Sequence, residues 1–131
     1  MTKSPLLVLL ALSASAAAAA AAPLSGAEIQ ARAGEFRGDT NGGRGLESHI
    51  WKLMPGGQAR AVVSLKRGLS ALNGTTIEYG DSGSWRVEGN TLCVNWGGPN
   101  AAYSGCYAID SQQGNHVRMV GPARWEGTLE R

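Results

Sequence analysis

The chain has few of the residues that metal and cofactor sites use. Its 131 residues include only two cysteines and two histidines, and His49 and His116 lie far apart in the sequence. A structural zinc site needs about four nitrogen or sulfur ligands at close spacing, and these four side chains do not offer that arrangement. We therefore expect neither a metal nor a cofactor.

A long apolar run and an excess of one charge are also missing. The apolar stretch Leu6 to Leu12 gives way to serine and alanine, and it is well short of the ~20 apolar residues of a spanning helix. Twelve basic side chains face ten acidic ones, for a formal net charge of +2, and the two signs are interspersed along the chain. These features argue against a membrane-spanning protein and against a nucleic-acid partner.

The N-terminal segment has the layout of a secretory signal peptide. Residues 1–22 combine Lys3, the short apolar core and a tract that is almost entirely alanine, which is the order of regions that export leaders show. Cleavage within Ala20 to Ala22 would leave residues 23–131 as a single domain with one hydrophobic core. The sequence therefore predicts a periplasmic or secreted protein, and we expect a monomer.

Glycine is unusually frequent in the remaining domain. All 19 glycines lie after residue 22, whereas an average protein holds ~7% glycine. Such a composition favours turns over helices. Residues 34–45 carry five of these glycines and, apart from Phe36, almost no apolar side chain. We interpret this stretch as a long exposed loop, which either has no specific role or carries the function.

The remaining sequence predicts a mainly β fold with one short helix. Ser25 and Glu28 form a capping-box pattern, which predicts a helix over residues 26–33. Alternating apolar and polar residues predict strands that follow one another with short turns; the clearest are 46–53, 59–65, 75–79 and the pairs within 83–120. The expected architecture is a small antiparallel meander or barrel of six to eight short strands with one N-terminal helix.

The two cysteines predict both a disulfide and a strand register. In an exported chain, Cys93 and Cys106 are expected to be joined. If they lie opposite each other, Leu92 lies opposite Tyr107, and the register continues to Trp96 opposite Tyr103 around a turn at 98–101. A two-residue turn at Gly89 and Asn90 gives the same inner face, because alternate residues of a strand point the same way.

One motif resembles the nucleophile loop of chymotrypsin-type serine proteases. It is the run 80–83, whose Ser82 would need a histidine base such as His49 and a carboxylate to orient that base. The domain is about half the length that two barrels need, and the sequence around His49 does not resemble that family. A hydrolase using Ser82 and His49 is therefore a disfavoured alternative.

A second motif, Asp39-Thr40-Asn41, begins like a calcium-binding loop. That loop needs glycine at its sixth position and glutamate at its twelfth, and here Arg44 and Ile50 occupy those positions. An EF-hand is thereby excluded.

Aromatic residues near the predicted hairpin tip offer the better candidate site. Trp96 and Tyr103 are expected at the tip, with Asn95 and Arg86 nearby, and side chains of these kinds often make up recognition surfaces. We therefore predict a binding patch for a protein, a peptide or a glycan, made of Arg86, Asn95, Trp96 and Tyr103.

The segment 81–96 resembles a family of small exported proteobacterial proteins of unknown function. It follows the pattern DxGxWxVxGxxLCxxW, a second cysteine follows at Cys106, and residues 24–29 are similar to the family's opening. This resemblance implies export and a compact β domain with a disulfide, and it supplies no reaction or catalytic residues.

A looser likeness, carried by Gly83-Ser84-Trp85 and the single disulfide, is to periplasmic protease inhibitors of the small-barrel type. The expected function is therefore that of a non-enzymatic periplasmic binding or envelope-accessory protein. A protease inhibitor is the alternative.

The disulfide gives the first testable prediction. The protein is purified from the periplasm and alkylated without reduction. Mass spectrometry should then find no label at Cys93 or Cys106. Closing a loop of this length is worth about 3 kcal/mol in the chain-entropy model, so reduction should also lower the free energy of unfolding. Two free thiols in the unreduced protein would contradict the pairing.

Overall fold

The structure is a computed structural model that describes residues 22–42, 45–66 and 76–131. Most of the predicted leader, residues 1–21, lies outside these ranges. Among the described residues there is no helix with the length and apolar character needed to cross a membrane.

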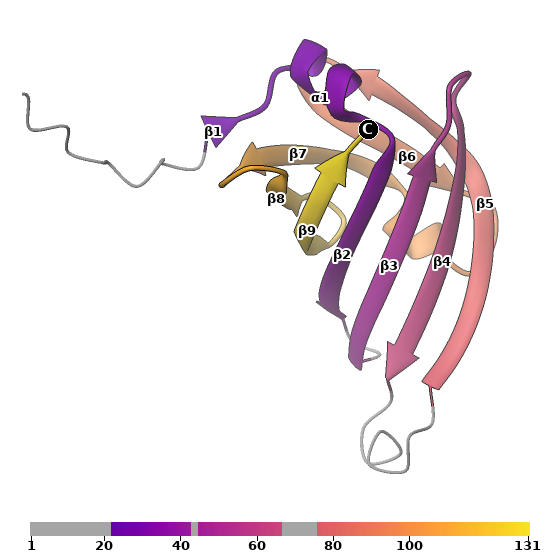
Figure 1. The fold of residues 1–131 in the computed structure, drawn as a ribbon. Coiled ribbons are helices and arrows are strands. Elements are labelled where there is room, and N and C mark those ends of the chain that lie inside the picture. The colour runs from indigo at the N-terminus through magenta and orange to yellow at the C-terminus, as the bar shows by residue number, and fades with distance from the viewer. Residues whose placement is uncertain (1–21, 43–44, 67–75) are drawn as a thin grey trace, which may run out of the picture.

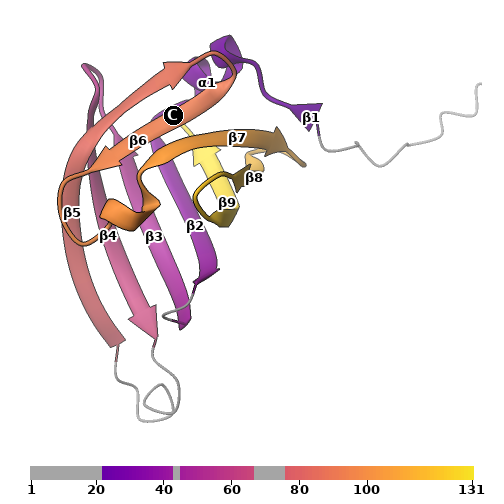
Figure 2. The same cartoon turned by 180° about the vertical axis from the view of Figure 1, so that it is seen from behind.

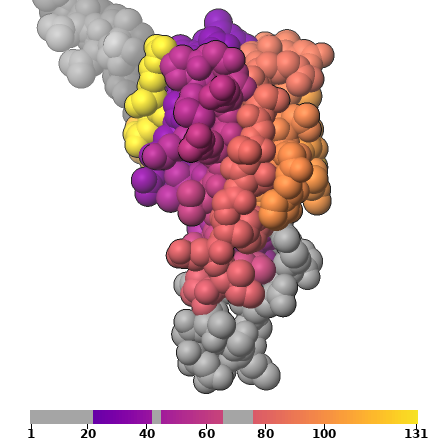
Figure 3. All heavy atoms as spheres, turned by 90° about the vertical axis from the view of Figure 1, so that its right-hand side faces the viewer, coloured from indigo at the N-terminus to yellow at the C-terminus, as the bar shows by residue number. Residues whose placement is uncertain are grey.

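Eight antiparallel strands form a closed barrel in which each strand pairs with its neighbours in the sequence (Figure 1 and, from behind, Figure 2). The strands are β2 (Glu35–Gly42), β3 (Gly45–Leu53), β4 (Gln58–Lys66), β5 (Thr76–Glu88), β6 (Thr91–Trp96), β7 (Gly105–Ser111), β8 (His116–Val120) and β9 (Arg124–Glu130). Pairing of β9 with β2 closes the barrel, so among the described residues its wall has no long free edge. Figure 3 shows one outer face of this wall, with β5 between β4 and the strands that follow. The predicted mainly β barrel is confirmed.

A short helix, α1 (Gly26–Arg32), covers one end of the barrel (Figure 1). The predicted capping box is present: Ser25 Oγ accepts from the Glu28 N–H at 3.2 Å, and Glu28 Oε1 accepts from the Ser25 N–H at 3.1 Å. The bond from the Ser25 backbone favours the ionised carboxyl and lowers the pKa of Glu28. This stabilisation is present above the usual pKa of a glutamate and is lost as the pH falls through the lowered value. Ile29 anchors the helix, with its side chain fully buried in the core.

An additional strand, β1 (Ala22–Pro23), leads into the helix. It pairs with the end of β7, where Ala22 lies opposite Ser111 and Pro23 lies opposite Asp110. The segment that precedes α1 therefore extends the sheet beside the end of β7.

The predicted register of β6 and β7 is confirmed at the disulfide. Cys93 lies opposite Cys106 with their Cα atoms 4.0 Å apart, and Leu92 lies opposite Tyr107. The disulfide sits on the outer side of the sheet, while Leu92 and Tyr107 point into the core.

The register does not continue to Trp96 and Tyr103, and this part of the prediction is wrong. The ladder stops at Val94 and Gly105, and residues 101–103 form a short 3₁₀ helix, η2 (Ala101–Tyr103). The cause is a carboxylate on the neighbouring strand: Asp81 Oδ2 accepts from the backbone N–H groups of Gly98 at 3.2 Å and Asn100 at 2.8 Å. These bonds draw the connection toward β5 instead of letting it close as a regular hairpin.

The prediction of a loop over residues 34–45 is also wrong, because residues 35–42 are strand β2 in the barrel wall. Gly38 lies opposite Gly127 of β9. A Cβ on Gly127 would come within 1.9 Å of the Arg37 carbonyl oxygen, and one on Gly38 would come within 2.2 Å of the Phe36 ring. Gly127 therefore allows β9 to lie close to β2, and Gly38 leaves room for the Phe36 ring. Neither glycine makes a turn.

The core fills the barrel with large apolar side chains. Trp51 lies near its centre, with ring centroids of Phe36, Trp96 and Trp125 between 5.1 and 5.3 Å away. Such offset and edge-on ring contacts stabilise a core beyond the area that they bury. Trp85 lies opposite Val94 and both are buried in the core, in agreement with the predicted turn at Gly89 and Asn90.

The Gly38–Gly127 contact generates a prediction about stability. Gly127→Ala should lower the free energy of unfolding by about 1–3 kcal/mol, because the added methyl group overpacks the β2–β9 contact. Urea unfolding followed by tryptophan fluorescence measures the change.

The matched control is Gly80→Ala on β5, where a Cβ would meet its nearest neighbour, the Ala61 carbonyl oxygen, at an ordinary 3.5 Å. This substitution should leave stability unchanged or raise it by up to about 1 kcal/mol. Equal losses in the two variants would show that the strand contact is not what requires glycine at 127.

Candidate functional site at the barrel end opposite the helix

A group of polar side chains lies inside the barrel, at the end away from α1. We call it the polar cluster; its members are Glu47, His49, Tyr79, Asn100 and Tyr103. Glu47, His49 and Asn100 are almost completely buried. Glu47 and His49 are two residues apart on β3, so the alternation of the strand points both into the barrel.

His49 links the cluster to the aromatic core. Its Nδ1 accepts a hydrogen bond from the indole N–H of Trp51 at 3.1 Å, and its Nε2 lies 3.2 Å from Glu47 Oε1. An indole nitrogen can only donate, so Nδ1 carries no proton and the Nε2 proton is donated to Glu47. The imidazole is neutral in this arrangement, and both of its nitrogens are engaged.

Side chains from other parts of the wall complete the cluster around the Glu47 carboxylate. The Tyr103 hydroxyl donates to Glu47 Oε2. The Tyr79 hydroxyl lies 3.1 Å from Asn100 Oδ1 and 3.4 Å from Glu47 Oε1, and its single proton can serve only one of them at a time. Tyr107 helps to hold Tyr103 in place, because its hydroxyl donates to the Tyr103 carbonyl oxygen at 2.7 Å.

Trp125 connects the cluster with the surface at this end of the barrel. Its ring centroid lies 4.5 Å from that of His49 and 5.2 Å from that of Tyr103. Within the described part of the chain, the indole N–H of Trp96 and Asn100 Nδ2 have no hydrogen-bond partner. The indole N–H of Trp125 makes no well-aligned hydrogen bond, but it lies near enough to the Tyr107 hydroxyl to favour the ionised form of that group. A buried donor without an acceptor costs about 1–3 kcal/mol, so the Trp96 and Asn100 donors are unusual and point to a role beyond packing.

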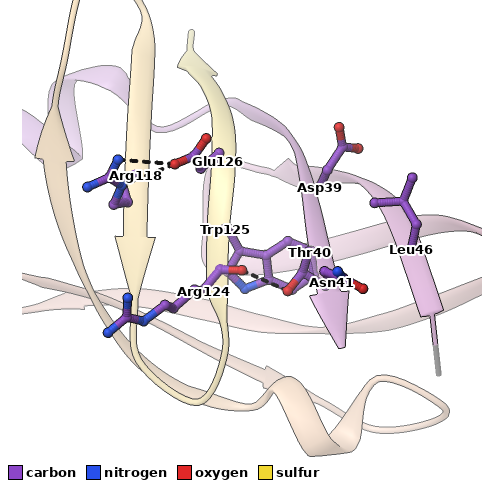
Figure 4. A pocket seen from close by; sticks show the side chains of 8 residues that line it. All are labelled: Asp39, Thr40, Asn41, Leu46, Arg118, Arg124, Trp125 and Glu126. Atoms are coloured by element: carbon purple, nitrogen blue, oxygen red, sulfur yellow. Dashed lines mark hydrogen bonds and ion pairs between the residues drawn. The ribbon is translucent and has the colours of Figure 1, made fainter. Parts of the chain in front are cut away.

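A groove of about 530 Å³ opens beside this cluster, where β2 and β9 separate (Figure 4). The ladder between these strands ends at Asp39 and Glu126, and past that point the Thr40 hydroxyl donates to the Arg124 carbonyl oxygen at 2.7 Å. We call this hollow the β2–β9 groove. It is lined by Asp39, Thr40, Asn41, Leu46, Arg118, Arg124, Trp125 and Glu126.

The groove and the polar cluster share Trp125. The residue is fully buried, yet its indole lies behind the Thr40–Arg124 hydrogen bond in Figure 4 and forms part of the groove lining. On the β9 side, Arg118 is paired with Glu126 at 3.1 Å. The Trp125 ring therefore lies between the groove and the rings of His49 and Tyr103.

The structure does not bring the four sequence-predicted binding residues together. Trp96 and Tyr103 point into the barrel, with 3% and 9% of their surfaces exposed, whereas Arg86 and Asn95 are exposed on the outside. Arg86 pairs with Glu88 at 2.9 Å. It also lines a second groove, of about 570 Å³ beside α1, together with Trp85 and Arg131.

Ser82 and His49 are also far from forming a catalytic pair. His49 lies inside the barrel with 1% of its surface exposed, and Ser82 is exposed on β5. The nearby Asp81 carboxylate holds the loop before η2, as described above, and accepts from the Ser82 backbone N–H at 2.7 Å.

Sequence reasoning missed Glu47 and Trp125. For Glu47 a signal existed, because strict alternation along β3 places it on the same face as Trp51 and Leu53, and a carboxylate at a core position is unusual. For Trp125, the alternation of residues along its strand indicates a side chain that points into the barrel. It does not indicate a neighbouring groove, because the groove depends on where two strands distant in the sequence stop pairing.

Tyr107 gives a pH-dependent prediction for this site. Burial raises the pKa of its hydroxyl from 10.0 to about 12. The folded protein keeps a proton that the unfolded chain releases, so this stabilisation is complete below pH 10 and is lost as the pH rises toward 12, by about 2–3 kcal/mol in total. Tyr107→Phe should cost about 1 kcal/mol at neutral pH through the lost hydrogen bond.

The measurement is urea unfolding of both proteins at several pH values. The free energy of unfolding of Tyr107→Phe should fall less steeply than that of the wild type between pH 10 and 12. Parallel pH profiles for the two proteins would contradict a raised Tyr107 pKa.

Comparison of the chain with protein-family models, with curated proteins and with solved structures finds no match. The function is therefore inferred from the residues and geometry of the chain itself.

Proposed function

We propose that this chain is an exported, non-enzymatic binding protein of the cell envelope and that its ligand occupies the β2–β9 groove. The observation that carries the proposal is the position of Trp125. One residue lines the groove and contacts the rings of His49 and Tyr103 in the polar cluster. A ligand in the groove would thus be separated from the polar cluster by the Trp125 ring.

The energetics of the polar cluster support a functional role. Burying a carboxylate and an imidazole costs free energy that their hydrogen bonds only partly recover, and apolar side chains of similar volume often stabilise a core as well or better. An eight-stranded barrel is just wide enough either to be filled by side chains or to hold one small ligand. Polar side chains gathered at one end, next to a groove, fit a barrel that receives its ligand at that end.

Binding also fits the chemistry better than catalysis does. The His49 nitrogens are committed to Glu47 and Trp51, and Ser82 lies on the other side of the wall, so no nucleophile and base face each other there. A protease inhibitor would need an extended exposed segment. Residues 34–45, expected from the sequence to be a long exposed loop, contribute β2 to the wall. The described residues therefore give no support to the protease-inhibitor alternative.

The test is capture of a small molecule, measured by native mass spectrometry. The full chain, expressed with its leader, is incubated with the low-molecular-mass fraction of an envelope extract. We expect a bound mass with the wild type and its loss in the double variant Asn41→Ala/Arg124→Ala, because both positions line the groove.

The matched control is Asn95→Ala/Arg86→Ala. It removes the same two residue types from exposed positions outside the β2–β9 groove, and it should keep the bound mass. No bound mass on the wild type, or equal binding by all three proteins, would refute the proposal. Circular dichroism of each variant verifies that it is folded.

A further inference from the structure

We infer that the β2–β9 groove recognises an uncharged polyhydroxylated ligand, a saccharide being the chemical class that fits best. This inference rests on the function proposed above and names the ligand class for the same groove. It is drawn from the charge balance of the lining, the kinds of hydrogen-bonding groups present, and the apolar side chains Leu46 and Trp125 in the lining.

The charges that line the groove cancel. Asp39 and Glu126 are acidic, Arg118 and Arg124 are basic, and Arg118 is already paired with Glu126. With two carboxylates and two guanidinium groups, the lining has no net charge and attracts neither an anion nor a cation overall. This balance favours a neutral ligand.

The polar groups of the lining suit adjacent hydroxyls. Carboxylate, amide and guanidinium groups are planar and present two acceptors, an acceptor and a donor, or several donors side by side. A pair of neighbouring hydroxyl groups, each able to donate and to accept, can bond to any of them in a bidentate way. Asp39, Asn41 and Glu126 provide such groups within one groove. The Ser48 hydroxyl donates to Asp39 Oδ1 at 2.7 Å and so fixes the orientation of that carboxylate.

The floor and one side of the groove supply the other contacts that a sugar ring needs. The ring of Trp125 forms part of the groove lining. Leu46 is an apolar side chain with 45% of its surface exposed, and it lies across the groove from Arg118 and Glu126 in Figure 4. It offers apolar area to the C–H face of a ring. The volume of about 530 Å³ falls within the ~300–1,000 Å³ of small-ligand sites.

The experiment is a titration of the full chain with sugars of matched size and different charge. Glucose and N-acetylglucosamine are the neutral probes, glucuronic acid is the anionic one and glucosamine is the cationic one. Binding is followed by isothermal titration calorimetry and by tryptophan fluorescence. We expect at least one neutral sugar to bind with a dissociation constant of about 1 mM or lower and both charged sugars to bind at least about tenfold more weakly.

Groove variants locate the binding. Asn41→Ala should raise the dissociation constant about tenfold, the equivalent of one lost hydrogen bond, whereas Asn95→Ala, an exposed strand asparagine outside the groove, should leave it unchanged. Glu126→Ala should weaken binding, and Glu126→Gln should restore part of it, because the amide keeps a planar pair of hydrogen-bonding atoms. A purely structural role of Glu126 would not produce this difference in affinity at unchanged stability.

Each other outcome overturns the inference. Preferential binding of a charged sugar would replace the ligand class and leave the groove as a binding site. The absence of sugar binding, combined with a groove-dependent bound mass from the envelope extract, would also reject saccharides and keep the proposed function. If neither sugars nor the bound mass depend on the groove, both the ligand class and the proposed function fail.

Discussion

The barrel depends on the pairing of β9 with β2, because this contact alone turns an eight-stranded meander into a closed wall. Gly38 and Gly127 face each other where the two strands come closest, and a side chain on Gly127 would collide with the β2 backbone. The same ladder ends at Asp39 and Glu126, and the strands then separate. The closed part of the wall and the groove are therefore adjacent along the same pair of strands. The strands pair closely at Gly38 and Gly127, and the β2–β9 groove begins one residue further on, at Asp39 and Glu126.

This constraint explains which features the sequence could predict. The alternation of Trp85, Val87, Leu92 and Val94 and the disulfide between Cys93 and Cys106 are local, and they define the same register. The role of Gly38 is not local, since it depends on Gly127 from the other end of the domain. In the sequence, a glycine that permits a close strand contact cannot be distinguished from a glycine that makes a turn. The high glycine content of residues 34–45 therefore predicts a loop, although Phe36 and Thr40 lie at alternate positions as inward residues of a strand.

The candidate site shows the same division. Inward directions could be predicted wherever a strand is regular, as for Trp51, Trp96 and Trp125. The position of Tyr103 could not, because Asp81 captures the backbone of residues 98 and 100 and converts the expected hairpin into η2. Tyr103 thereby enters the barrel and reaches Glu47. The polar cluster is thus assembled from strand alternation on β3 and one carboxylate that redirects a distant loop.

Loss of stability on mutation would not by itself show that the polar cluster serves a ligand. Removing one partner from a buried hydrogen-bonded charge is expected to destabilise any protein by several kcal/mol, whether or not a ligand is involved. The groove lining separates the two roles, because Asn41, Arg124 and Glu126 are exposed, and exposed side chains of this kind contribute little to folding. Their effect on binding can be observed in a protein that remains folded. If the cluster were only structural, its position beside a neutral, hydrogen-bonding groove and the Trp125 ring that contacts both would have no common explanation.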